Sequence, residues 1–165
     1  MDPFTIVTSW IAGVKIGSFL SDLVYGKNVS HLSRGQEYFS LGQKKRDFEF
    51  IKKAISEFDQ IDENEDRLVV VACSYLYRAM CYTLLEKFSL TYYFLDKLEI
   101  IKYNSFTRKK DTIEEIKSEG RKFRIEVEKI ESSISSDTNW QKVLIIFLVI
   151  IGGCITAATL YFFFF

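Results

Sequence analysis

The feature that most constrains this chain is a run of 23 residues, Val143 to Phe165, without a single charged side chain. A helix of that length, at ~1.5 Å per residue, measures ~35 Å, which is enough to cross a hydrocarbon core of ~30 Å with some tilt. A helix packed inside a water-soluble fold normally carries a polar stripe, and this run has none. The pattern predicts a transmembrane helix over residues 143–165.

The residues before this run have the character of the water-facing end of a membrane helix. Thr138 and Gln141 have the spacing of a capping box, in which two side chains satisfy backbone N–H groups at a helix start. Trp140 is expected at the lipid–water interface, with Lys142 extending its ammonium group into water beside it. We therefore predict a cap and hinge over residues 136–142.

The charges on the two sides of the run predict its orientation. Lys129 and Lys142 precede it, and no charged residue follows it. Because cytoplasmic flanks of membrane helices are enriched in Lys and Arg, the positive-inside rule places the preceding domain in the cytoplasm. The arrangement resembles the tail-anchored class of membrane proteins, which implies a single-pass protein and leaves open which membrane holds it.

The composition of the whole chain argues against several classes of function. It has 22 basic and 22 acidic residues, and a chain without excess positive charge is not expected to bind nucleic acid. It has one histidine, and no Walker A, dinucleotide-binding or zinc-protease motif is present. The sequence therefore predicts a non-enzymatic protein that uses no cofactor and no metal.

Residues 1–25 are largely apolar, but Lys15 and Asp22 interrupt them. Three interpretations stay open for this segment. It forms a helix that covers the core of the soluble domain, a helix in the membrane interface with Trp10 as its anchor, or a second membrane span.

Small residues at a spacing of four occur in both apolar segments of the chain. Gly13 and Gly17 form a G-x-x-x-G motif, and Gly153 and Ala157 repeat this spacing in the predicted span. Small side chains at this spacing let two helices approach closely inside a membrane. These four residues are candidates for such a contact.

Residues 34–135 are predicted to form an all-α cytosolic domain of antiparallel hairpins. Residues 26–35 contain two glycines, an asparagine and two serines, so we expect a loop there. Residues 36–61 are expected to be helical, with an apolar stripe. Its members are Phe48, Ile51, Ile55 and Phe58.

Residues 67–88 are apolar nearly all round, which predicts the central helix of the domain. Cys73 and Cys81 lie ~12 Å apart along this helix, too far for a disulfide, and are expected to be buried thiols. A second helix is predicted over residues 89–104, and the short connection between the two helices predicts an αα-hairpin.

This hairpin resembles a degenerate tetratricopeptide repeat over residues 72–105. The large, small and aromatic positions of the two helices are occupied by Tyr75, Ala79, Tyr82, Phe88, Thr91, Leu95 and Leu98. Arg78 departs from the family, which has leucine there, and Tyr103 stands where proline often ends the repeat. The alternative is an ordinary helical hairpin that packs its own core.

The resemblance implies a module that binds peptides or partner helices. The candidate contact residues on the hairpin are Tyr75, Arg78, Tyr82 and Tyr92. One mitochondrial fission adaptor family shares the outline of a tetratricopeptide-like cytosolic domain with a C-terminal anchor, although its anchor ends in a short basic tail and this chain ends in "YFFFF".

Residues 113–134 carry a heptad pattern of apolar residues. Its members are Ile113, Ile116, Gly120, Phe123, Val127, Ile130 and Ile134. Gly120 is expected to leave a hole in this seam and to weaken the helix by ~1 kcal/mol. The favoured interpretation is a long amphipathic helix packed on the domain's own hairpins. The alternative is a free seam that binds a second copy or a partner helix through Phe123, Val127 and Ile130.

Two functions agree with these patterns. The first is a membrane-anchored helical interaction module, an adaptor or scaffold, at the cytoplasmic face. The second is a small subunit or regulator of a membrane complex, with a second membrane contact through residues 3–25. In both cases the expected partners are the lipid bilayer, a protein of unknown identity and, for a free seam, another copy of the chain.

Overall fold

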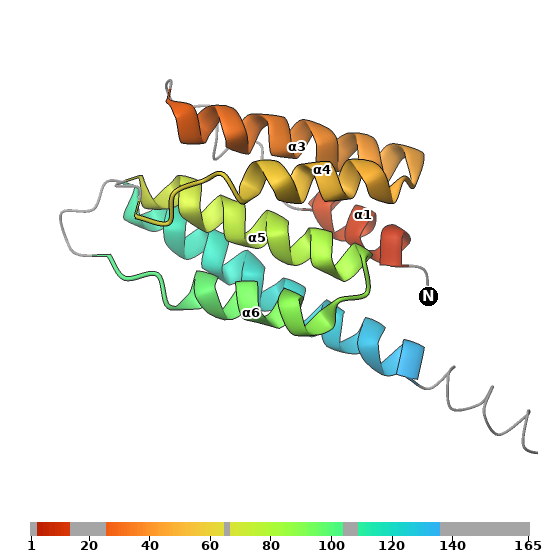
Figure 1. Cartoon of the computed structure of the whole chain (residues 1–165). Helices are drawn as coiled ribbons and strands as arrows, with labels where there is room; N and C mark the ends of the chain where they lie inside the picture. The colour runs from red at the N-terminus through yellow and green to blue at the C-terminus, as the bar shows by residue number, and fades with distance from the viewer. Residues whose placement is uncertain (1–2, 14–25, 65–66, 104–108, 136–165) are drawn as a thin grey trace, which may run out of the picture. The chain divides into compact units, whose positions relative to one another are not determined.

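The computed structural model describes residues 3–13, 26–64, 67–103 and 109–135 (Figure 1). Every regular element in these ranges is an α-helix, and no strand occurs in them, which confirms the all-α prediction. The elements are α1 (Pro3–Gly13), α3 (Lys27–Lys45), α4 (Phe48–Phe58), α5 (Leu68–Leu84), α6 (Phe88–Glu99) and a further helical run over 110–135.

No helix within those ranges is both long and apolar enough to cross a membrane. The predicted span over 143–165 and its cap over 136–142 lie outside the described residues, as do Gly17, Trp140, Lys142, Gly153 and Ala157. Trp10 and Gly13 belong to the last turn of α1.

The chain divides into two units, residues 1–128 and residues 129–165. The first, called the helical unit below, contains nearly all of the described residues. Of the second unit, only residues 129–135 are described, and they are helical.

The prediction of a loop over residues 26–35 was wrong, because α3 begins at Lys27. The residues that this helix buries recur every three or four positions and form one face. They are Leu32, Gly35, Phe39 and Gly42. The loop prediction rested on the low helix propensity of the glycines, serines and asparagine in this segment. Burial of the apolar face outweighs that low propensity and stabilises the helix.

The expected helical stretch over residues 36–61 is broken into two antiparallel helices. Arg46 has a left-handed backbone (φ 52°), and the N–H of Asp47 bonds to the carbonyl of Gly42 at 2.9 Å. The Asp47 side chain then accepts a hydrogen bond from the N–H of Glu49 at 2.9 Å and caps α4. Arg46 therefore ends α3 as its C-cap, and Asp47 begins α4 as its N-cap.

Two glycines let α3 and α4 pack closely. A Cβ atom at Gly35 would lie 2.3 Å from the ring of Phe58, and one at Gly42 would lie 2.5 Å from Cδ1 of Ile51. Any larger residue at either position must displace a fully buried side chain of α4. The hairpin therefore depends on glycine at its contact face.

α5 is the central helix, as a sequence that is apolar nearly all round predicts. All of its residues except Leu68 and Tyr82 are buried. The hydroxyl groups of its serine and its threonine bond within the helix, because Ser74 donates to the carbonyl of Val71 at 3.0 Å and Thr83 to that of Ala79 at 2.9 Å. Figure 1 shows α5 between α4 and α6, and these helices bury its surface together with α1, α3 and the run over 110–128.

α1 contributes side chains to the same core. Phe4 and Val7 are buried, and the ring of Phe4 lies 5.3 Å from that of Phe48 on α4. This is the position that the core-covering interpretation of the N-terminal segment requires. Residues 14–25 of that segment lie outside the described residues.

The heptad seam packs into the helical unit. Ile113, Ile116, Phe123 and Val127 have no exposed surface and belong to the core. At Gly120, a Cβ atom would lie 2.6 Å from Cδ2 of Leu98. Beside this contact, a pocket of about 350 Å³ is lined by Gly120, Leu95 and Leu98, so the predicted hole is filled only in part.

We predict that Gly35→Ala destabilises the helical unit. The added methyl group raises helix propensity by ~1 kcal/mol. Its clash with the enclosed ring of Phe58, at 2.3 Å, should cost ~2–3 kcal/mol, the upper part of the range for overpacking, since the ring has no free space to enter. Urea unfolding followed by circular dichroism should show a net loss of about 1–2 kcal/mol. The matched control is Ser40→Ala on the exposed face of α3, which should cost nothing; equal stability of the two variants would contradict the close contact.

The two thiols of α5 give a second prediction. Burial raises the pKa of Cys73 from 9.0 to about 12 and that of Cys81 well above its usual value. The unfolded chain therefore loses these protons at a lower pH than the folded chain, so the free energy of unfolding should fall as the pH rises above about 9. In a Cys154→Ser background, neither thiol should react with a maleimide at neutral pH until urea is added. Cys73→Ala should weaken the alkaline loss of stability, and an unchanged slope would contradict the assignment.

Candidate protein-binding surface

A buried arginine organises the most distinctive cluster of the helical unit. Arg78 lies in the middle of α5 with only 4% of its surface exposed. Its guanidinium group donates a hydrogen bond to the carbonyl of Phe58, at the end of α4. Nε lies 3.3 Å from Oδ1 of Asp59, and Nη1 lies 3.8 Å from Oε1 of Glu63. Because Nε makes no hydrogen bond, its approach to Asp59 is a contact between charges.

Aromatic rings enclose the other side of this guanidinium group. Its carbon lies 5.1 Å from the ring centre of Phe94 and 5.9 Å from that of Tyr75. The ring of Tyr82 stacks on that of Phe94, with ring centres 5.5 Å apart and an interplanar angle of 3°. The ring of Tyr93 meets that of Phe94 edge-on, with ring centres 5.1 Å apart. Offset and edge-on ring pairs of this kind are attractive beyond the area that they bury. Phe94 of α6 is therefore the centre of the cluster.

The cluster becomes more exposed toward α6. Tyr75 and Phe94 are buried, Tyr82 is half-buried, and Tyr93 and Leu90 expose 50% and 37% of their surface. Leu90 and Tyr93 are one helical turn apart and so lie on the same side of α6. We call Tyr82, Leu90 and Tyr93 the aromatic face.

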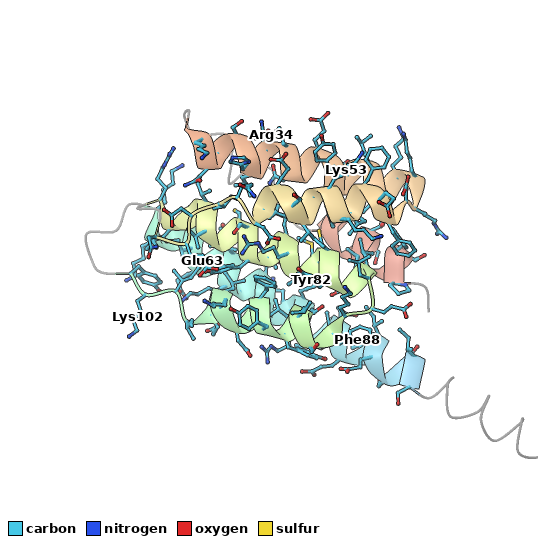
Figure 2. The ribbon with its side chains drawn as sticks, in the orientation of Figure 1. Arg34, Lys53, Glu63, Tyr82, Phe88 and Lys102 are labelled. Atoms are coloured by element: carbon cyan, nitrogen blue, oxygen red, sulfur yellow. The ribbon has the colours of Figure 1, made fainter. Side chains whose placement is uncertain are left out.

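An ion pair borders the aromatic face. The ammonium group of Lys97 lies 3.2 Å from Oε2 of Glu63 and 5.7 Å from the ring centre of Tyr93. In Figure 2, Glu63 lies before the start of α5 and Tyr82 toward its end, with Phe88 at the start of α6. The face thus has an apolar centre and a polar border, which is the usual composition of a protein interface.

The surroundings of this cluster stabilise the protonated forms of two tyrosines and one lysine. Burial, and then the charge of Glu63, raise the pKa of Tyr75 to about 12, and burial also raises the pKa of Tyr82. The hydrogen bond from Lys97 to Glu63 raises the pKa of Lys97. The tyrosines therefore stay neutral and the lysine stays charged near neutral pH, so none of these groups is prepared to act as a nucleophile or a base.

The single histidine belongs to an ion-pair group that joins α3 to α4. Nδ1 of His31 lies 2.8 Å from Oε2 of Glu57, and Nε of Arg34 donates to the same oxygen at 3.1 Å. The hydrogen bond with His31 is the main cause that lowers the pKa of Glu57. No group of metal-ligating side chains occurs in the part of the chain that the structure describes.

Several residues predicted to meet a partner are enclosed by the fold. Tyr75 and Arg78 are buried beneath the aromatic face, so they expose little surface to a partner. Phe123 and Val127 are buried in the core, as the favoured interpretation of the heptad pattern expects. A role of these four residues in partner binding stays a prediction. Ile130 is also buried, with 1% of its surface exposed, and offers no contact area. The apolar residues of the heptad pattern, such as Phe123 and Val127, therefore pack in the core of the helical unit.

Two other predicted residues have separate places. Tyr82 belongs to the aromatic face, as predicted. Tyr92 lies on another side of α6, where the guanidinium carbon of Arg124 is 5.6 Å from its ring centre. Tyr92 is therefore involved in the contact between α6 and the run over 110–128.

The sequence reasoning missed Leu90, Tyr93 and Lys97, although a signal for them exists. These residues are spaced at i, i+3 and i+7, which places them on one side of a helix. A large apolar residue, an aromatic and a cation on one side of a helix indicate an exposed amphipathic surface. Glu63 had no such signal, because it lies in a turn whose position depends on the packing of α4 on α5.

No protein-family model, no curated protein and no solved structure matches this chain. The assignment of a function therefore depends on the surfaces of the helical unit itself.

Replacement of Arg78 tests its role beneath the aromatic face. Arg78→Ala removes the guanidinium group that contacts the rings of Tyr75 and Phe94, its hydrogen bond to the Phe58 carbonyl and the buried volume of the side chain, and should cost about 3 kcal/mol of unfolding free energy. Arg78→Met keeps most of the stem and should recover about half of that loss. Urea unfolding measures both values. Equal losses would show that the charge, and not the packing, supports the cluster.

Proposed function

We propose that this chain is a membrane-attached helical adaptor that binds a helix or an extended segment of another protein at the cytoplasmic surface. The observation that supports this function most directly is the aromatic face. Tyr93 and Leu90 remain substantially exposed, although the rings beneath them are held firmly by Arg78. Exposed tyrosines on a rigid, desolvated base are the side chains that most often dominate the energy of protein interfaces.

The sequence of α5 and α6 also supports a binding module. Their hairpin is the region that resembles a tetratricopeptide repeat, a family that binds peptides or helices. Membrane attachment is supported by the charge-free residues 143–165, and the cytoplasmic orientation by Lys129 and Lys142 before them.

The core position of Phe4 and Val7 favours the adaptor over a complex subunit with a second membrane contact. Apolar side chains already buried against α4 and α5 are not available to lipid. The described part of the N-terminal segment therefore has a role inside the helical unit.

Photo-crosslinking tests the partner-binding face. A photoreactive phenylalanine derivative replaces Tyr93 in the full chain in its native cells. We expect a discrete adduct that disappears when Leu90→Asp is added, because a carboxylate in the middle of the face opposes desolvation. The matched control places the same derivative at Glu115, an exposed position on the run over 110–128. Equal adducts from positions 93 and 115 would reject the aromatic face as the binding site.

Membrane attachment has its own test. The full chain should resist alkaline carbonate extraction from membranes, whereas a chain that ends at Lys142 should be released. Release of the full chain would reject the membrane-attached adaptor even if the crosslink at position 93 were found.

A further inference from the structure

Basic side chains gather where α3 ends and α4 begins. Residues 44–53 contain five basic residues and two acidic ones. The bases are exposed; they are Lys44, Lys45, Arg46, Lys52 and Lys53. We call these five residues the basic patch.

The acids within this segment do not neutralise the patch. Asp47 is engaged as the cap of α4, and Glu49 pairs with Lys52 at 2.7 Å. Among the described residues, no carboxylate lies within ion-pair distance of Lys44, Lys45 or Lys53. Some other exposed cations of the helical unit are paired across helices, as Arg121 is with Glu99 at 2.7 Å. Lys44, Lys45 and Lys53 therefore contribute positive charge to the basic patch that no described carboxylate pairs.

Aromatic rings accompany these cations. The ammonium groups of Lys45 and Lys53 lie 4.8 Å and 5.3 Å from the ring centre of Phe50. Phe48, two residues earlier, exposes 47% of its surface. Cations gathered around a half-buried ring, with an exposed phenylalanine nearby, are typical of surfaces that meet the headgroup layer of an anionic membrane.

The basic patch lies at the end of the helical unit from which the chain continues toward residues 143–165. Phe48 lines one depression with Leu84 and Leu85, so the α3–α4 turn and the end of α5 are neighbours. The run over 110–128 is antiparallel to α6, because Lys117 contacts Ile101 whereas Arg124 contacts Asp96. Residue 128 is therefore at the same end as Phe88, where α6 begins.

The connection to the predicted span is short. Residues 129–142 separate the helical unit from Val143. Even fully extended, this connection spans ~50 Å, so the end with the basic patch stays within reach of the bilayer surface. A cationic surface held this close to a membrane meets a high local concentration of lipid headgroups.

We propose that the basic patch docks the helical unit onto anionic lipid headgroups. The proposal builds on membrane attachment under the proposed function and adds an orientation to it. The α3–α4 turn faces the lipid, and the aromatic face on α6, a different hairpin, stays open to a protein partner.

Lysine acetylation in nanodiscs tests this docking. The full chain is reconstituted into discs of phosphatidylcholine, with or without phosphatidylserine, and acetylation rates are measured by mass spectrometry. Lys44, Lys45 and Lys53 should react about fivefold more slowly in the anionic discs, and high salt should abolish the difference. Lys102 is exposed and lies at the left of Figure 2, whereas Lys53 lies toward the right, so the rate of Lys102 should not change.

A charge reversal adds a matched pair of variants. Lys53→Glu should return the acetylation of Lys44 and Lys45 in anionic discs toward the rates in neutral discs. Lys102→Glu, which makes the same change in charge elsewhere, should leave those rates unaltered.

Each alternative result has a distinct meaning. Equal rates in both lipids, in a chain that has entered the discs, would overturn the docking and leave membrane attachment intact. Equal slowing of Lys102 would also overturn it, since the effect would not be specific to the patch. If Lys44, Lys45 and Lys53 reacted more slowly than Lys102 in both kinds of disc, the docking on anionic lipid would also be overturned, and the result would indicate that protein covers the patch. Failure of the chain to enter discs would reject membrane attachment and, with it, the docking.

Discussion

The burial of α5 on all sides is the constraint on which the rest of this structure depends. A helix that is apolar nearly all round exposes its backbone and side chains to water unless every side is covered. α4 and α6 cover two sides of α5, and α1, α3 and the run over 110–128 complete the cover. Because each of these elements is amphipathic and buries its own apolar face against α5, none of them has an obvious reason to fold alone.

One polar residue within this core determines the character of the surface above it. Arg78 places a charge where the other residues of α5 are apolar or form local hydrogen bonds. Its guanidinium group satisfies the end of α4 on one side and packs against Tyr75 and Phe94 on the other. Tyr93 on α6 and Tyr82 on α5 therefore rest on a base that is both charged and closely packed, which limits their freedom before any partner binds.

The two exposed surfaces of the helical unit differ in chemistry and in position. The aromatic face on α5 and α6 is apolar at its centre, with an ion pair of Glu63 and Lys97 at its border. The basic patch at the α3–α4 turn has an excess of positive charge around Phe48 and Phe50. Association with protein favours the first surface, and association with anionic headgroups favours the second, so the two kinds of contact do not compete for the same residues.

The sequence by itself determined the helical class, the central position of α5 and the heptad face of the run over 110–128, because periodicity and uniform hydrophobicity are local properties of the chain. It also determined the charge-free residues 143–165. Only the tertiary structure decided that residues 27–35 are helical and that Arg46 and Asp47 separate two helices, since burial of Leu32 against other helices outweighs local propensity. The same holds for the candidate surface. Spacing alone marks Tyr75, Tyr82 and Phe123 equally as large residues on a helix, whereas their exposure depends on which neighbours cover each one.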